Sequence, residues 1–159
     1  MADELRQQAF DREFRGQIER FTQRLITALR RIVTTPVPPV VKVLAFEMQA
    51  DWGNFPVYAF GMDVKSLDEA YFEPPFNGHV LPDAGELVPD GAIDQDGYEM
   101  AGIATYESGA RVMAVWFGEC WHAAGGALFS IPTYIHLHDD LDYFDLRTRL
   151  WVRNTNPSA

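Results

Sequence analysis

Residues 107–126 read ESGARVMAVWFGECWHAAGG, and the rest of the chain is best understood outward from this stretch. Its apolar residues recur at helical spacing and share one face of a helix: Ala110, Met113, Phe117, Cys120 or Trp121, and Ala124. A strand is the competing interpretation, because residues 112–117 form a short apolar run. The pattern continues for about four turns, longer than a usual strand, and Gly125 and Gly126 follow where a helix ends. We therefore predict a buried central helix, which Gly118 weakens by roughly 1 kcal/mol relative to alanine.

The same stretch holds the chain's one cysteine, Cys120, close to His122. A reactive thiol beside a base is one interpretation, but residues two apart on a helix do not face each other. We favour a buried, unreactive thiol beside a partly buried histidine. A single cysteine also excludes an internal disulfide, which is typical of a reducing compartment.

The composition indicates a folded, acidic protein. With 159 residues, 47% apolar residues and 13% aromatic residues, the chain suits a single domain over 1–159 and argues against disorder. The formal net charge of -10 is uneven: residues 1–33 carry +2 and residues 34–159 carry -12. Residues 66–110 hold ten acidic residues and no Lys or Arg. Such a surface repels nucleic acid and favours a basic partner.

We predict an α+β fold with a long N-terminal helix, an antiparallel sheet of about four to five strands and the one buried central helix. The N-terminal helix spans residues 3–33, with a break expected near Gly16. Its apolar seam has a three/four spacing: Phe10, Phe14, Ile18, Phe21, Leu25, Leu29 and Ile32.

Between the N-terminal and central helices, and after the central helix, alternating apolar residues and turn-forming residues indicate strands. Residues 65–97 form a long acidic loop region, with a short helix expected over residues 67–72. The tail 154–159 is expected to fray. The predicted strands are residues 40–49 paired with 57–64, then 128–131, 134–138 and 146–152.

No N-terminal apolar signal and no membrane-length apolar run occur, so we expect a cytoplasmic protein without membrane contact. A membrane-surface role for the Arg-rich N-terminal helix is the alternative, which the acidic remainder opposes. A dimer through this helix is also considered.

Two histidines suggest an alternative chemistry. His136 and His138 share one face of a strand, a spacing that can place two imidazoles on one metal. Cys120, His122 or Asp139 would have to complete such a site, and no common zinc spacing is present. His138 with Asp139 or Asp140 as an acid/base pair is the other alternative. No nucleophile motif or phosphate loop accompanies them, so we predict no catalytic residue, no metal and no cofactor.

Exposed acidic and aromatic residues favour a protein–protein surface instead. Trp52, Phe55, Tyr143 and Phe144 lie in predicted turns, although they also suit a role as caps of the core. The predicted partner-binding residues are Glu73, Asp83, Asp94, Asp96, Asp139, Asp140, Asp142 and Tyr143.

Two segments resemble a known class of proteins. WFGECWHAAGG at residues 116–126 and HDDLDYFDLRTRLWV at residues 138–152 are similar to uncharacterised bacterial domains of the polymorphic-toxin immunity-protein type. The resemblance implies a cytoplasmic protein that binds and blocks a toxin without catalysis, and it supplies no functional residue. Our leading hypothesis is therefore a non-enzymatic acidic protein that neutralises a basic toxin. The alternative is a metal-dependent enzyme using His136 and His138.

Overall fold

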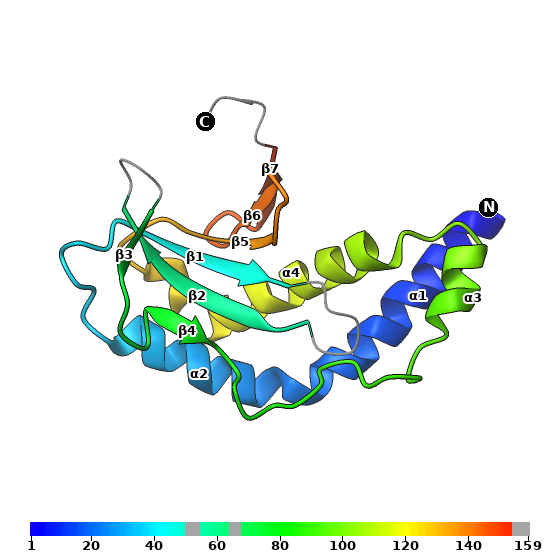
Figure 1. Cartoon of the computed structure of the whole chain (residues 1–159), viewed down its shortest axis with the longest axis horizontal. Coiled ribbons are helices and arrows are strands. Elements are labelled where there is room, and N and C mark those ends of the chain that lie inside the picture. The colour runs from blue at the N-terminus through cyan, green and yellow to red at the C-terminus, as the bar shows by residue number, and fades with distance from the viewer. Residues whose placement is uncertain (50–54, 64–67, 154–159) are drawn as a thin grey trace.

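The computed structural model describes residues 1–49, 55–63 and 68–153, which form a layer of helices against one face of a mixed sheet (Figure 1). Trp52 and the tail 154–159, for which a turn and fraying are predicted, lie outside this part of the chain. The helical elements are α1 (Ala2–Ile18), η1 (Glu19–Phe21), α2 (Thr22–Thr34), α3 (Gln95–Met100), α4 (Thr105–Ala123) and η2 (Gly126–Leu128). The strands are β1 (Val43–Met48), β2 (Val57–Met62), β3 (Glu69–Tyr71), β4 (Asn77–His79), β5 (Thr133–Leu137), β6 (Tyr143–Asp145) and β7 (Leu150–Val152).

The N-terminal helix forms as two α-helices joined by the short 3-10 turn η1. The predicted seam is confirmed, since all seven of its apolar residues are buried. The break predicted near Gly16 is found slightly later, where the chain changes helix type at Glu19. A 3-10 turn brings residues three apart onto one side, so η1 carries the seam from Ile18 to Phe21 without turning it away from the core.

The central helix α4 is confirmed, and it packs against both N-terminal helices and against the sheet. Its Phe117 ring centroid is 4.8 Å from that of Phe46 on β1. On the side of the N-terminal helices, Trp116 Nε1 donates a hydrogen bond to Thr22 Oγ1 at 3.0 Å. The helix ends where Gly125 adopts a left-handed conformation with φ of 94°.

The sheet differs from the prediction in size and in direction. Within the described part of the chain it has seven strands in the order β3-β2-β1-β5-β6-β7, with β4 also paired to β2. β1 and β5 are parallel, whereas the other pairs are antiparallel. The expected all-antiparallel sheet is wrong at this pair because α4 returns the chain across the sheet before β5 begins. Parallel neighbours need such a crossover.

The acidic region 65–97 is more ordered than predicted, because it contributes β3, β4 and the first residues of α3. The helix expected over residues 67–72 is wrong where the structure describes it, since Glu69–Tyr71 form β3. Both β3 and β4 pair with the outer edge of β2, whose backbone groups would otherwise lack partners.

The C-terminal strands also differ from their predicted bounds. Residues 126–128 form η2, so the strand expected over 128–131 is wrong, and β5 begins only after Pro132. The acidic turn expected over 139–145 is shorter, because Tyr143–Asp145 form β6. The chain then turns between β6 and β7, where Asp145 Oδ1 accepts hydrogen bonds from Arg147 N and Thr148 N at 2.8 and 2.9 Å. This side-chain cap divides the strand predicted over 146–152.

Candidate functional site on the open face of the sheet

The sheet has one covered face and one face over which no described helix lies (Figure 1). Leu44, Phe46 and Met48 of β1 belong to the core that α4 covers. Because side chains alternate along a strand, Glu47 points to the opposite, open face.

Strand register aligns five side chains across this open face. Residues that pair directly on neighbouring strands point to the same side of a sheet. The aligned residues, which we call the sheet-face row, are His79 of β4, Tyr58 of β2, Glu47 of β1, His136 of β5 and Tyr143 of β6. The row brings together carboxylate, imidazole and phenol groups from distant parts of the sequence.

Glu47 lies at the centre of the row, and both predicted histidines contact it. His138 Nδ1 is 2.7 Å from Glu47 Oε1, and His136 Nε2 is 3.7 Å from Glu47 Oε2. The Glu47 side chain is 18% exposed, whereas that of His138 is 54% exposed. The hydrogen bond to Glu47 raises the pKa of His138, and the charges of Glu47 and Asp139 add to this effect.

Backbone contacts position the His138 main chain and the His136 ring. The His138 N–H donates to Met48 O at 2.7 Å, which extends the parallel pairing of β1 and β5 by one residue. His136 Nδ1 donates to Leu137 O at 3.1 Å, so in the neutral ring the Nε2 that faces Glu47 carries no proton. The contact between His136 and Glu47 is therefore attractive only when His136 is protonated.

Aromatic rings surround this carboxylate. The Tyr134 ring centroid is 4.9 Å from that of Tyr143 and 5.7 Å from that of His136. Burial raises the pKa of Tyr134, with smaller effects from Tyr143 and Glu47. At the other end of the row, the His79 and Tyr58 rings lie 5.0 Å apart, and burial lowers the pKa of His79. Tyr134 thus remains a protonated hydrogen-bond donor at neutral pH.

The predicted residues that adjoin the row are those between β5 and β6. We call Asp139, Asp140 and Asp142 the acidic turn. Asp139 Oδ2 lies 3.4 Å from His138 Nε2, and Asp140 Oδ1 accepts a hydrogen bond from Asp142 N at 3.1 Å. Tyr143 follows at once as a member of the row. The acidic turn therefore adds negative charge beside Glu47.

The other four predicted acidic residues are exposed but belong to other elements. Glu73 lies between β3 and β4, and Asp83 lies in the loop after β4. Asp94 caps α3 by accepting a hydrogen bond from Gly97 N at 3.1 Å, and Asp96 lies within α3. Figure 1 shows α3 beside the N-terminal end of α1, away from β3 and β4. The structure does not gather the eight predicted residues into one site.

The helix residues considered as metal partners lie apart from the strand histidines. Cys120 is buried in the core beneath the covered face, where burial raises its pKa to about 12. His122 Nε2 is 2.9 Å from Leu146 O. Within residues 1–49, 55–63 and 68–153, no group of three or more His, Cys, Asp or Glu side chains is arranged to hold a metal ion.

Sequence reasoning did not select Glu47, Tyr58, His79 or Tyr134 as site residues. Alternation along residues 40–49 does place Glu47 on one face of a strand, as an acid among apolar residues. The row itself depends on the parallel pairing of β1 with β5 and on the pairing of β4 with β2. These pairings join distant segments, and no local pattern encodes them.

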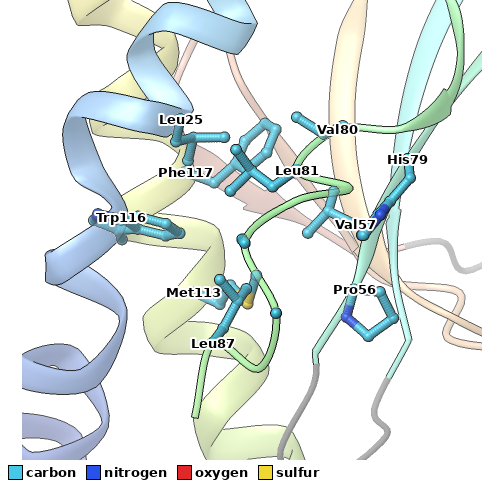
Figure 2. A pocket seen from close by; sticks show the side chains of 12 residues that line it. Leu25, Pro56, Val57, His79, Val80, Leu81, Leu87, Met113, Trp116 and Phe117 are labelled. Atoms are coloured by element: carbon cyan, nitrogen blue, oxygen red, sulfur yellow. The ribbon is translucent and has the colours of Figure 1, made fainter.

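A small cavity lies under the loop that follows β4, between the sheet and the helices (Figure 2). Leu81 and Leu87 of the loop line it together with Met113, Trp116 and Phe117 of α4. Its volume is about 10 Å³, room for at most about one water molecule. This space is part of the core and is not a ligand site.

No protein-family model, curated protein or solved structure matches the chain. None of the described helices is both long and apolar enough to span a bilayer. The chemistry of the sheet-face row is therefore the basis for a functional assignment.

Proposed function

We propose that this protein is a non-enzymatic binding domain that receives a basic protein partner on the open face of its sheet. The observation that carries the proposal is the sheet-face row, with a half-buried carboxylate at its centre and the acidic turn at its side. Its groups recognise cations and hydrogen-bond donors, and none of the five is an activated nucleophile.

The sheet-face row and the acidic turn contribute to binding in different ways. Glu47 anchors a lysine or arginine side chain of the partner, and the faces of Tyr58, Tyr134 and Tyr143 add cation–π contacts. The exposed carboxylates of the acidic turn steer the partner toward this face over longer distances. Such steering raises the association rate and weakens as salt is added.

A basic toxin is the partner that this surface and the resemblance to immunity-type domains both favour. Many toxins that act on nucleic acid need a basic surface to reach it, and an acidic aromatic face competes for that surface. Such an inhibitor has no need of a cofactor and acts in the cytoplasm before the toxin reaches its target.

Capture from lysate of the source cell tests the proposal. The immobilised full chain is compared with the triple variant Asp139→Asn, Asp140→Asn, Asp142→Asn. The matched control removes three charges elsewhere: Glu73→Gln, Asp83→Asn, Asp96→Asn. We expect a basic protein that the wild type and the control retain at low salt, and that high salt or the acidic-turn variant releases.

Two outcomes would contradict the proposal. If no basic protein is retained at low salt, the binding function loses its support. If the acidic-turn variant and the control lose the partner equally, net charge and not this face drives binding. Rescue of growth when the captured protein is expressed together with this chain would identify the partner as a toxin.

The second candidate function is a metal-dependent enzyme, which the convergence of His136 and His138 on Glu47 favours. Metal analysis of the purified protein separates the two candidates. A stoichiometric metal that is lost in the variant His136→Ala, His138→Ala would promote the enzyme, and its absence from both proteins would leave the binding function.

A further inference from the structure

A groove lies between the C-terminal half of α2 and the segment 74–82 that surrounds β4, which run side by side (Figure 1). This groove has a volume of about 380 Å³, within the range of about 300–1,000 Å³ typical of small-molecule sites. Its polar lining residues are Arg31, Asn77 and His79. Its apolar walls come from Ala28, Ile32, Pro74, Pro75, Val80 and Pro82.

The walls of the groove are rigid before any ligand arrives. Proline rings fix the φ angle of the backbone on one side. Asn77 and His79 belong to β4, whose pairing with β2 holds them, and Val80 N donates to Val57 O at 2.9 Å. On the other side, Ile32 is a buried member of the α2 seam. A preformed groove of this kind binds a ligand with little cost of ordering.

The charge of the groove is positive although the molecule is strongly acidic. Of the described residues that line it, Arg31 is the one with a formal charge. The segment 74–82 belongs to the stretch 66–110, which holds ten acidic residues, yet none of them lines the groove. Glu69 accepts a hydrogen bond from Asn77 Nδ2 at 3.3 Å, outside the lining. Arg31, the charged residue among those that line the groove, therefore favours an anion over a cation.

Arg31 is available for a ligand. No ion pair involves it among the residues that the structure describes, whereas Arg15 is held by Glu19 and Glu119. A guanidinium beside apolar walls suits a carboxylate, which it can bind through two parallel hydrogen bonds. His79 is half-buried, stacks on Tyr58 and offers one ring N–H as a further donor.

We infer that this groove binds a small monoanion with an apolar body, of the aryl-carboxylate class. The carboxylate pairs with Arg31, and the ring packs against Ile32 and the prolines. The groove shares His79 with the sheet-face row, but Arg31, which would hold the carboxylate, lies on α2 outside that row. Replacement of Arg31 therefore tests the inference independently of the proposed partner.

Titration of the full chain with phenylacetate, followed by amide NMR shifts and calorimetry, tests the inference. Phenylacetamide and phenethylamine serve as neutral and cationic probes of nearly the same shape. We expect saturable binding of phenylacetate with shifts at Arg31, His79 and Val80. The amide should bind at least about tenfold more weakly because it lacks the charge-assisted pair, and the amine should not bind.

Three variants complete the test. Arg31→Gln should weaken phenylacetate binding at least tenfold, whereas the neighbouring exposed Arg30→Gln should leave it unchanged. Ala28→Leu should fill the groove and abolish binding while the protein stays folded by circular dichroism. The inference is overturned if phenylacetate does not saturate, if the amide binds equally well, or if Arg31→Gln binds as the wild type does.

Discussion

At the scale of single residues, Glu47 is the side chain whose environment is least expected from its type. A carboxylate that is largely removed from water loses hydration, and it remains charged only if other groups compensate. His138 provides that compensation through a hydrogen bond of 2.7 Å, and His136 adds to it when protonated. The hydrogen bond from His138 N to Met48 O extends the pairing of β1 with β5, and this pairing brings Glu47 and His138 together.

Replacing Glu47 with glutamine should lower the pKa of His138 toward its ordinary value of 6.5, because the raising hydrogen bond and charge are both removed. NMR titration of the imidazole measures this directly. Asp139→Asn, which removes the smaller of the two carboxylate effects, is the control and should shift the pKa less. An unchanged His138 pKa in Glu47→Gln would contradict the described contact.

The contact between Glu47 and His138 also makes the free energy of unfolding depend on pH. Because the pKa of His138 is raised in the folded state, its contribution to the free energy of unfolding is complete below 6.5 and is lost as pH rises through the folded pKa. The wild type should therefore exceed Glu47→Gln in stability by more below pH 6.5 than above the folded pKa. Urea titrations of both proteins on either side of this window supply the comparison.

Cys120 is a case in which burial makes an otherwise reactive group inert. Burial raises the pKa of its thiol to about 12, so almost none of it is thiolate at neutral pH. We expect iodoacetamide to modify the folded protein far more slowly than the same protein in urea. Rapid alkylation without denaturant would show that the thiol is accessible and would revive the reactive-cysteine alternative.

At the scale of elements, the glycines of α4 show why helix propensity misleads in a core. From the sequence, Gly118 only weakens the helix. In the structure, a Cβ at this position would lie 2.9 Å from the Phe144 ring, and one at Gly109 would lie 2.8 Å from the Phe14 ring. These glycines let β6 and α1 approach α4 closely. Their cost in helix propensity is offset by packing on two sides.

Gly118→Ala should therefore destabilise the protein by about 1–3 kcal/mol, as overpacking does, despite a gain of roughly 1 kcal/mol in helix propensity. Gly16→Ala is the matched control, because an added Cβ there meets nothing within 4 Å. It should stabilise α1 by about 0.5–1 kcal/mol. Chemical denaturation measures both, and a Gly118→Ala protein more stable than the wild type would refute the packing argument.

The same contrast explains what the sequence could predict. Helical seams are local patterns, so α4 and the buried face of the N-terminal helices followed from spacing alone. Strand pairing is not local: nothing near residues 43–48 indicates a parallel partner at residues 133–137, and β3 and β4 are too short to show alternation. The candidate site was accordingly half predicted. His136, His138 and Tyr143 were named, whereas their partners Glu47 and Tyr58 depend on the pairing.

At the scale of the whole molecule, the predicted acidic residues lie in separate regions and do not form one negative patch. The predicted acidic residues occupy the acidic turn, the surroundings of β4, and α3. Only the acidic turn adjoins the aromatic and imidazole groups of the open face. Under the proposed function, net charge would attract a basic partner over long distances, and the sheet-face row would supply the specificity.

The oligomeric state is a separate question, because a dimer through the N-terminal helix was an alternative. The apolar seam of this helix is buried within the chain, so a dimer would have to use its outer side. There a groove of about 650 Å³ between α1 and α4 contains both arginines and carboxylates, with Gly16 in its lining. A dimer through this groove would have to remove its charged lining residues from water, which opposes association: Asp11, Arg12, Arg15, Glu19 and Arg111.

We therefore predict a monomer by light scattering at low and at moderate salt. If a dimer exists through this groove, Gly16→Leu should disrupt it without unfolding the chain, because Gly16 lines the groove. A dimer that forms at low salt and dissociates as salt is added would instead require opposite charges in contact. That result would point to pairing of the arginines of one copy with the acidic residues of another, an interface that the charge separation along this chain would then explain.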